Sequence, residues 1–455
     1  MRKKIPFLLC IVLLPLITFG QSKKSLDEAA LFSWKSIENR QISDDGKWLT
    51  YQLMPNKGDG NLIIMNTRTR EEITIERGKQ VYIDHHLEKL SCLVSPEETL
   101  IDSLKRMKKK EDELPIDTLL ILDLKTGEKQ LIPNVKSLKT PIKWDGFIIY
   151  QLDSDRDTFL EKVLPRKMKK DESVFIIHHL ENDQEDTLTY VQALILAEEE
   201  SVVYFHQNAS DSTKLTYIKQ LLLPDYDLHE VFSDKGTVSN LGTSRDGKQV
   251  TWLFDKDTSH HIIPEYDLYS REMPNEASKI VAEKERKDFI PDNWMISDNF
   301  QATYSPDGNR LFFGMAPIPL MPDTTLLPDE IVEVEIWNYQ DELLYTQQKV
   351  QEKKEKKRTY LACFDFAEHN LVPLGNEETQ TIIKHDKLEL EWAIGLEDQS
   401  MQKYLSWEGR TYKDLFLVSL LDGSKELVAK RISGDPEWSP GGKYIYWYEE
   451  PDTAW

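Results

Sequence analysis

Hydrophobic and polar residues alternate along most of the chain in short runs separated by turn-forming residues. This two-residue period is typical of β-strands that have one buried and one solvated face. Four runs share a format in which a Ser begins a turn, a Gly ends it and an alternating apolar run follows. Each predicts a tight hairpin, because Asp-Gly or Gly-Gly supplies the positive φ angle that such a turn requires. They read ISDDGKWLTYQL from Ile42, TSRDGKQVTWLF from Thr243, YSPDGNRLFFGM from Tyr304 and WSPGGKYIYWYE from Trp438.

The spacing of these turns indicates a repeat. Ser43, Ser244, Ser305 and Ser439 are separated by 201, 61 and 134 residues. A unit of roughly 50–65 residues fits all three gaps, provided that copies between them have lost the signature.

A second hairpin format lies between the copies of the first. LILDLKTGEKQLI from Leu120 and LFLVSLLDGSKELV from Leu415 place a Gly-containing turn between two strands, and the runs from Leu62 and Tyr360 are versions without the Gly. Two alternating hairpins make a four-stranded unit, the blade of a β-propeller. We therefore predict an all-β fold, a propeller with seven or eight blades in the complete protein. The alternative is a set of β-sandwich sheets whose turns match by chance.

Two charged stretches interrupt the β pattern. Residues 102–114 (DSLKRMKKKEDEL) and 349–358 (KVQEKKEKKR) have little apolar face. They predict solvated helices or loops that project from the propeller, and a docking or gating insertion is the alternative. The proline-rich run at 316–328 indicates a loop. No shift in composition divides residues 21–455, which we treat as one propeller domain.

The first twenty residues have the layout of a secretory signal peptide. Arg2, Lys3 and Lys4 precede an apolar run over residues 5–19, and Gly20 offers a small residue for cleavage. The run is shorter than the roughly 20 apolar residues that span a membrane. Cys10 lies too early in it to favour a lipid attachment site. We predict a mature chain in the periplasm or outside the cell, without a membrane span.

The composition of the chain limits the kinds of molecule that it is expected to bind. The 455 residues carry 57 Lys and Arg against 79 Asp and Glu, a formal net charge of −22, with 40% hydrophobic residues. Such apolar content excludes wholesale disorder, and the negative charge disfavours nonspecific binding to nucleic acid or to an anionic membrane. Only Cys92 and Cys363 lie outside the signal peptide. They could pair in an oxidising compartment, but buried free thiols are favoured.

Motifs for catalysis and for cofactor binding are missing from the sequence. A Gly-x-Ser-x-Gly nucleophile elbow does not occur, and the nearest approach, residues 242–246 (GTSRD), belongs to a predicted hairpin. H-E-x-x-H, the Walker loop and G-x-G-x-x-G are also missing, and Gly58-Asp59-Gly60 predicts only a turn. We therefore assign no catalytic, cofactor-binding or metal-binding residue to this chain and expect no cofactor.

Histidine pairs and acidic doublets are weaker candidates. Adjacent histidines on a strand point to opposite faces, so a pair cannot easily hold one metal ion. The doublets could line a channel, but solvated strand and turn positions are favoured. The pairs are His85-His86, His178-His179 and His260-His261, and the doublets are Glu71-Glu72, Glu377-Glu378 and Glu449-Glu450.

Taken together, the signal peptide, the Ser-Pro-Asp-Gly hairpins and the Trp-rich strands resemble the propeller region of bacterial prolyl oligopeptidase family serine peptidases. Three segments carry the resemblance further: EIWNYQDELLYTQQ from Glu335, PIDTLLILDLKTGE from Pro115, and the run from Tyr412 to Trp455. The first is moderately specific, and the other two are weaker. The likeness covers most of the mature chain.

The resemblance implies a non-catalytic role. In that family the propeller caps an α/β-hydrolase domain, which follows it in the chain and carries the Ser, Asp and His of the triad. The propeller restricts access to short or unfolded peptides. This sequence stops at Trp455 within a family-like run, so no family catalytic residue has a counterpart here. The glutamate pair of the dipeptidyl peptidase branch has no match either. We expect a peptidase fragment that is inactive as given, with an unclosed, unstable propeller whose exposed edge invites pairing.

Two other classes of function fit the same sequence. A stand-alone periplasmic propeller would act as a scaffold that binds proteins or ligands. A propeller enzyme, such as a glycan-processing protein, would need carboxylates clustered at its channel mouth, and no spacing in the sequence demonstrates them.

Overall fold

The protein is described here by a computed structural model, which covers residues 27–153, 164, 166–211, 213–256, 263–274, 277–283, 290–321, 325–327, 330–331, 334–450 and 452–455. The signal peptide therefore lies outside the described residues. The chain forms two compact units, one from Met1–His85 and Leu90–Pro133 and the other from His86–Lys89 and Asn134–Trp455. Among the described residues, none of the helices is both long and apolar enough to cross a membrane.

The first unit contains two four-stranded antiparallel sheets, each connected in chain order. A short helix, α1 (Glu28–Ser33), precedes them, and α2 (Glu98–Arg106) joins two strands of the second sheet. The strands are β1 (Lys35–Ile42), β2 (Trp48–Pro55), β3 (Asn61–Asn66), β4 (Glu72–Glu76), β5 (Gly78–Asp84), β6 (Lys89–Val94), β7 (Thr118–Asp123) and β8 (Lys129–Ile132). Buried residues of both sheets, including Leu62, Ile64, Leu90 and Leu120, form one hydrophobic cluster.

The second unit begins with a seven-stranded sheet that contains two blades. Its strands follow chain order, and β12 belongs to both blades because its first half pairs with β11 and its second half with β13. Tyr190, which has a φ of 57°, lies where the pairing changes sides. The strands are β9 (Val135–Lys139), β10 (Phe147–Leu152), β11 (Ser173–His179), β12 (Glu185–Leu196), β13 (Val202–Asn208), β14 (Leu215–Leu222) and β15 (Asp227–Lys235).

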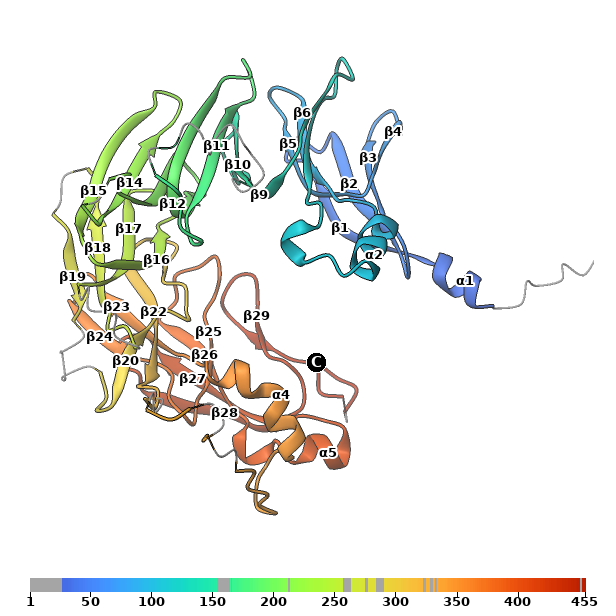
Figure 1. Cartoon of the computed structure of the whole chain (residues 1–455). Helices are drawn as coiled ribbons and strands as arrows, with labels where there is room; N and C mark the ends of the chain where they lie inside the picture. Colours follow the sequence, from blue (N-terminus) through green and yellow to red (C-terminus); the bar gives the residue numbers. More distant parts are fainter. Residues whose placement is uncertain are drawn as a thin grey trace, which may run out of the picture. The chain divides into compact units, whose positions relative to one another are not determined.

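Three further blades and a hairpin complete the second unit, in chain order from green to red in Figure 1. In one blade, β20 and β21 pair with the same strand, β22, and together take the first position. The strands are β16 (Thr237–Thr243), β17 (Gln249–Asp255), β18 (Asp267–Glu272), β19 (Lys279–Ala282), β20 (Trp294–Ser297), β21 (Thr303–Tyr304), β22 (Arg310–Pro317), β23 (Tyr360–Asp365), β24 (Asn370–Pro373), β25 (Thr381–Ile383), β26 (Trp392–Glu397), β27 (Lys413–Ser419), β28 (Lys425–Ile432), β29 (Glu437–Trp438) and β30 (Ile445–Tyr446).

Successive sheets of the second unit pack through shared apolar clusters. Trp252 of β17 is packed with Tyr204 of β13, and Phe313 of β22 with Leu268 of β18. Ala393 and Val418 pack with Phe312 of the preceding sheet. This face-to-face packing of four-stranded antiparallel sheets is the construction of a β-propeller. The predicted all-β propeller fold is thereby confirmed.

Both predicted hairpin formats occupy fixed places in the sheets. The Ser-to-Gly turns join the first and second strands of a blade, between β1 and β2, β16 and β17, β21 and β22, and β29 and β30. The second format joins the third and fourth strands, as between β7 and β8 or β27 and β28. Sheets without the first signature lie between those that have it, as the gaps in the repeat predicted.

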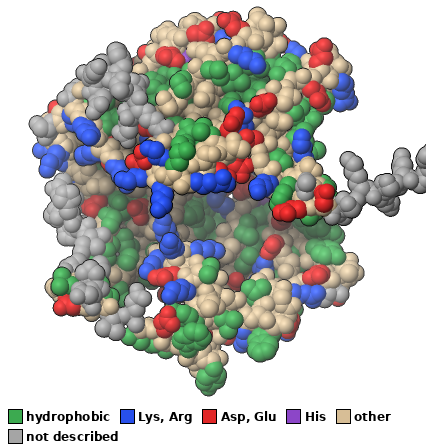
Figure 2. Space-filling view, turned by 45° about the vertical axis from the view of Figure 1, so that its right-hand side comes forward, with side chains coloured by type: hydrophobic (Ala, Val, Ile, Leu, Met, Phe, Trp, Pro, Cys, Tyr) green, Lys and Arg blue, Asp and Glu red, His purple; other side chains and the backbone are tan. Residues whose placement is uncertain are grey.

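Both charged stretches contain exposed helices. The helix α2 starts four residues before residue 102, and α4 (Tyr345–Glu355) lies between β22 and β23. Neither helix contains a buried residue. The prediction of solvated projections is confirmed for both. Acidic and basic side chains occur together over the face shown in Figure 2.

Candidate functional site

A groove of about 810 Å³ runs beside α4 in the second unit. The helix begins where the Leu344 backbone N–H donates to Gln347 Oε1 at 3.0 Å, one half of a capping box. Near its end, Lys356 Nζ and Glu352 Oε1 form an ion pair of 2.6 Å across one turn. These local contacts hold a helix that is polar all round, and they fix one wall of the groove.

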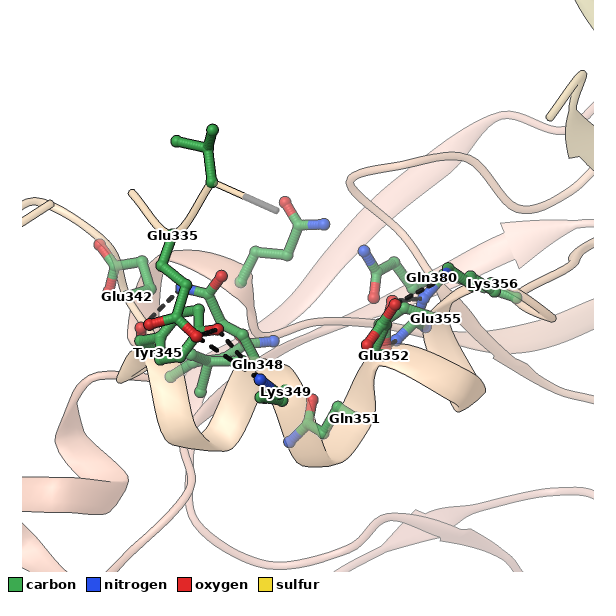
Figure 3. A pocket seen from close by; sticks show the side chains of 15 residues that line it. Glu335, Glu342, Tyr345, Gln348, Lys349, Gln351, Glu352, Glu355, Lys356 and Gln380 are labelled. Carbon is green, nitrogen blue, oxygen red and sulfur yellow. Dashed lines mark hydrogen bonds and ion pairs between the residues drawn. The ribbon is translucent and has the colours of Figure 1, made fainter. Parts of the chain in front are cut away.

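The segment that precedes α4 folds back onto the start of the helix. Trp337 stacks on Tyr345 with ring centroids 5.1 Å apart. Tyr345 Oη donates to Glu335 Oε1 at 2.5 Å, and Lys349 Nζ lies 3.5 Å from the same carboxylate oxygen (Figure 3). The hydrogen bond from Tyr345 lowers the pKa of Glu335, which is therefore ionised at neutral pH.

Glutamine side chains supply much of the remaining lining, and their amide orientation is fixed by main-chain partners. Nε2 of Gln348 donates to Leu343 O at 2.9 Å. Nε2 of Gln380 and Nε2 of Gln399 both donate to Glu377 O, at 3.1 and 2.6 Å. The main-chain carbonyl oxygens can only accept, so they bind the Nε2 side of each amide. The Oε1 atoms of these glutamines therefore remain available as acceptors.

A second cavity of about 340 Å³ shares Glu342 and Gln399 with the groove. Carboxylates from two strands and two loops line it: Glu342, Glu378, Glu397 of β26 and Asp414 of β27. Glu342 Oε1 accepts from Lys403 Nζ at 3.1 Å, whereas Glu342 Oε2 is buried without a hydrogen-bond partner among the described residues.

The residues that line the groove and the second cavity are suited to binding. They present amide and carboxylate acceptors to a ligand that brings hydrogen-bond donors. The lining of both cavities contains no Ser–His or Cys–His pair among the described residues, so this arrangement offers no activated nucleophile.

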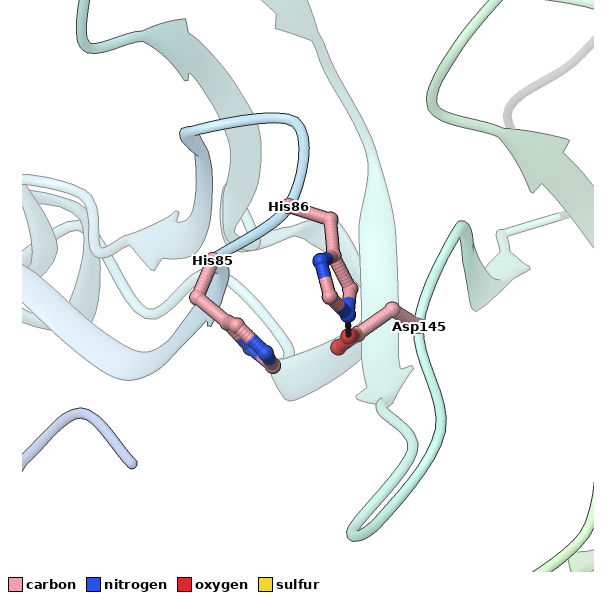
Figure 4. A group of neighbouring side chains, drawn as sticks. All are labelled: His85, His86 and Asp145. Carbon is pink, nitrogen blue, oxygen red and sulfur yellow. Dashed lines mark ion pairs between the residues drawn. The ribbon is translucent and has the colours of Figure 1, made fainter. Parts of the chain in front are cut away.

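Two of the three histidine pairs lie within the described residues. His178 of β11 is buried, with Nδ1 3.0 Å from Glu185 Oε1, while His179 points to the other face and is partly exposed. His86 Nε2 lies 3.4 Å from Asp145 Oδ2 in the second unit, and Figure 4 also draws His85, which belongs to the first unit. His260 and His261 lie outside the described residues.

Sequence analysis did not predict the groove. Of the acidic doublets, only Glu377-Glu378 contributes, through Glu378 and through the main-chain oxygen of Glu377. Glu449 instead accepts a 2.6 Å hydrogen bond from Ser433 Oγ. The one available signal was the segment from Glu335, which carries the family resemblance and forms part of the groove wall. Ser244 lies in the predicted hairpin turn between β16 and β17.

No protein-family model and no curated protein matches this chain. Several solved structures match it. The β-propeller domain of the Trilobed protease from Pyrococcus furiosus is 12% identical, with a TM-score of 0.34 over 89% of this chain and 100% of that chain. An acylaminoacyl peptidase from Pyrococcus horikoshii is 11% identical, with a TM-score of 0.35 over 89% of this chain and 55% of that chain. A eukaryotic initiation factor is 9% identical, with a TM-score of 0.45 over 90% of this chain and 81% of that chain.

These neighbours differ in what they are. The chain spans only about half the length of the acylaminoacyl peptidase. Solved structures similar to this chain thus include the β-propeller domain of one protease.

Proposed function

We propose that this chain is the non-catalytic propeller portion of an exported serine peptidase of the prolyl oligopeptidase family. In this role the propeller controls the access of short peptides to a separate hydrolase domain. The sequence contains no Gly-x-Ser-x-Gly elbow, so the nucleophile has to come from outside residues 1–455.

One observation carries the proposal. The segment from Glu335, the most specific part of the family resemblance, forms a structured insertion within a propeller blade, between β22 and β23. Its Trp337 packs on Tyr345 of α4, so the segment is folded against the helix that follows it. The other two resembling segments also contain strands, β7 in the segment from Pro115 and β27–β30 in the run from Tyr412.

The first test is the DNA downstream of codon 455. The proposal expects a frame, continuous or shifted, that encodes Gly-x-Ser-x-Gly followed by the Asp and the His of a triad. A stop codon directly after Trp455, with no such frame beyond it, would contradict the proposal and favour a stand-alone scaffold.

The second test uses the purified chain and the longer protein side by side. A fluorophosphonate probe should label the longer protein and leave residues 21–455 unlabelled. The longer protein should cleave short chromogenic peptides and spare a folded substrate protein of similar sequence. Labelling of residues 21–455 would refute the non-catalytic role, and equal cleavage of both substrates would refute the control of access.

A further inference from the structure

We propose that the groove beside α4 binds an extended peptide segment that carries Lys or Arg. This inference goes beyond the proposed function, because such binding depends on residues of this chain alone and not on a hydrolase domain.

The space available fits a chain-like ligand. The groove of about 810 Å³ and the cavity of about 340 Å³ meet at Glu342 and Gln399. Both volumes lie within the range of about 300–1,000 Å³ that is usual for ligand pockets. An extended ligand in the groove would therefore lie beside the two residues that also line the second cavity.

Negative charge dominates the lining. Seven different carboxylates line the two spaces, against three cationic side chains. All three of those cations are already paired, Lys349 with Glu335, Lys356 with Glu352 and Arg358 with Glu355. Lys403 and Lys425, which lie outside the lining, pair with Glu342 and Glu397, so Glu378 and Asp414 are the lining carboxylates without an ion pair among the described residues. The excess favours a ligand with positive charge.

Glu342 marks the position where that charge is expected. Its Oε2 atom is buried and has no hydrogen-bond partner among the described residues, which is costly for a carboxylate oxygen. An ammonium or guanidinium group would satisfy it with a charge-assisted hydrogen bond. Glu378, across the second cavity, also makes no side-chain hydrogen bond or ion pair among the described residues and offers a second contact.

The neutral part of the lining suits a peptide main chain. The Oε1 atoms of Gln348, Gln380 and Gln399 remain as acceptors because their Nε2 atoms bond to main-chain carbonyls. Peptide N–H groups are donors that would match them. A neutral oligosaccharide could donate hydroxyl hydrogen bonds to the carboxylates, but it would leave their negative charge uncompensated. Among the described residues, the carboxylates of these two spaces do not converge as ligands for one metal ion.

The test measures peptide binding to the mature chain, residues 21–455, by fluorescence anisotropy at low salt. The probes are a labelled peptide of alternating Ala and Lys and its counterpart with Glu in place of Lys. The Lys peptide should bind at least about tenfold more tightly, and its affinity should fall as the salt concentration rises. Equal binding of the two peptides would overturn the proposal, as would tighter binding of a neutral oligosaccharide such as cellotetraose.

Substitutions then locate the site. Glu342→Gln should weaken binding of the Lys peptide by about tenfold, and the more exposed Glu378→Gln by about twofold to threefold. The matched control is Glu426→Gln on the exposed face of β28, outside both spaces, which should leave the affinity unchanged. Circular dichroism establishes that each variant is folded. If Glu342→Gln and Glu378→Gln both bind like the control, the site is refuted, whatever the outcome for the hydrolase domain.

Discussion

At the residue scale, an ion pair with a fully buried carboxylate lies just before β11. Glu172 is 5% exposed and receives two hydrogen bonds from the Arg166 guanidinium, at 2.6 and 2.7 Å. Asn208 Nδ2 and the Lys169 N–H each donate to the same carboxylate at 2.8 Å. Burial alone would raise the pKa of Glu172, but these donors outweigh it and hold the pKa below its ordinary value.

This lowered pKa predicts a pH-dependent contribution to stability. Because the folded state holds the proton of Glu172 less tightly than the unfolded state, the contribution is full above about pH 5. It is lost as the pH falls through the pKa of the folded state, below the ordinary value of 4.5. Glu172→Gln should cost about 3 kcal/mol at pH 7, and this cost should shrink toward pH 3. Urea denaturation at several pH values measures it.

Glu426→Gln serves as the control for this prediction, because Glu426 is exposed. Its free energy of unfolding should follow that of the unaltered chain at every pH. A cost of Glu172→Gln that stays constant from pH 7 to pH 3 would contradict the assignment of the lowered pKa.

The two cysteines outside the signal peptide give a second prediction at this scale. Cys92 and Cys363 are free and buried, and burial raises the pKa of each thiol to about 12. A thiol that is neither ionised nor accessible does not react. Native protein of residues 21–455 should therefore not react with Ellman's reagent, whereas the same protein unfolded should titrate two thiols. Rapid reaction of the native protein would show that at least one of the two thiols is accessible, which would contradict the prediction.

Sequence predicted the state of the cysteines but not the Glu172 cluster. Two cysteines within apolar alternating runs are expected on the buried faces of strands, which is where they lie. Arg166 and Glu172 belong to a segment without periodicity, and they meet Asn208 only because pairing through β12 brings the end of β13 near the start of β11. Contacts of that kind depend on tertiary structure, which a pattern of polar residues does not encode.

At the scale of elements, the Ser-to-Gly turns repeat one set of hydrogen bonds. In the turn between β16 and β17, Gly247 N–H donates to Ser244 O at 3.1 Å and Gln249 N–H donates to Ser244 Oγ at 2.9 Å. Ser244 Oγ in turn donates to Asp246 Oδ1 at 2.7 Å. The turns at Ser43 and Ser305 have the same three bonds, so the motif is a structural device.

Gly247 is the residue of this turn that is least replaceable. Its φ is +70°, and an added Cβ would lie 2.9 Å from both Ala197 Cβ and Val202 Cβ. Gly247→Ala should therefore cost about 2–4 kcal/mol through backbone strain and overpacking together. Gly409→Ala is the matched control, because Gly409 has the same φ with no atom within 4 Å, and it should cost about 1 kcal/mol. Denaturation midpoints that are equal for the two variants would contradict the role of packing.

The sequence predicted hairpins better than it predicted sheet boundaries. Turn chemistry is local, so Ser, Asp and Gly at fixed spacing indicate the hairpin directly. The sharing of β12 between two blades and the split first strand formed by β20 and β21 depend on pairing between distant segments. The groove beside α4 depends on the same kind of convergence, since residues 334–358 meet Gln380 and Gln399 only after folding.

At the scale of the whole molecule, export is predicted from a signal peptide that lies outside the described residues. The three cations of residues 2–4, the apolar run over 5–19 and the small Gly20 form a signal peptide pattern. Cleavage after Gly20 would remove those three cations and change the formal net charge from −22 to −25. A strongly negative surface keeps a protein soluble and limits its adhesion to anionic lipid, which suits a chain released outside the cytoplasm.

Expression of the chain with its own N-terminus in a Gram-negative host tests this prediction. The mature protein should appear in the periplasmic fraction or the medium, and its N-terminal sequence should begin at Gln21. Leu13→Arg is the control, because a charge in the middle of the apolar run should stop export and leave an uncleaved chain in the cytoplasm. An unaltered chain that keeps residues 1–20 in the cytoplasm would contradict export, and a mature chain that begins with a lipid-modified Cys10 would contradict release.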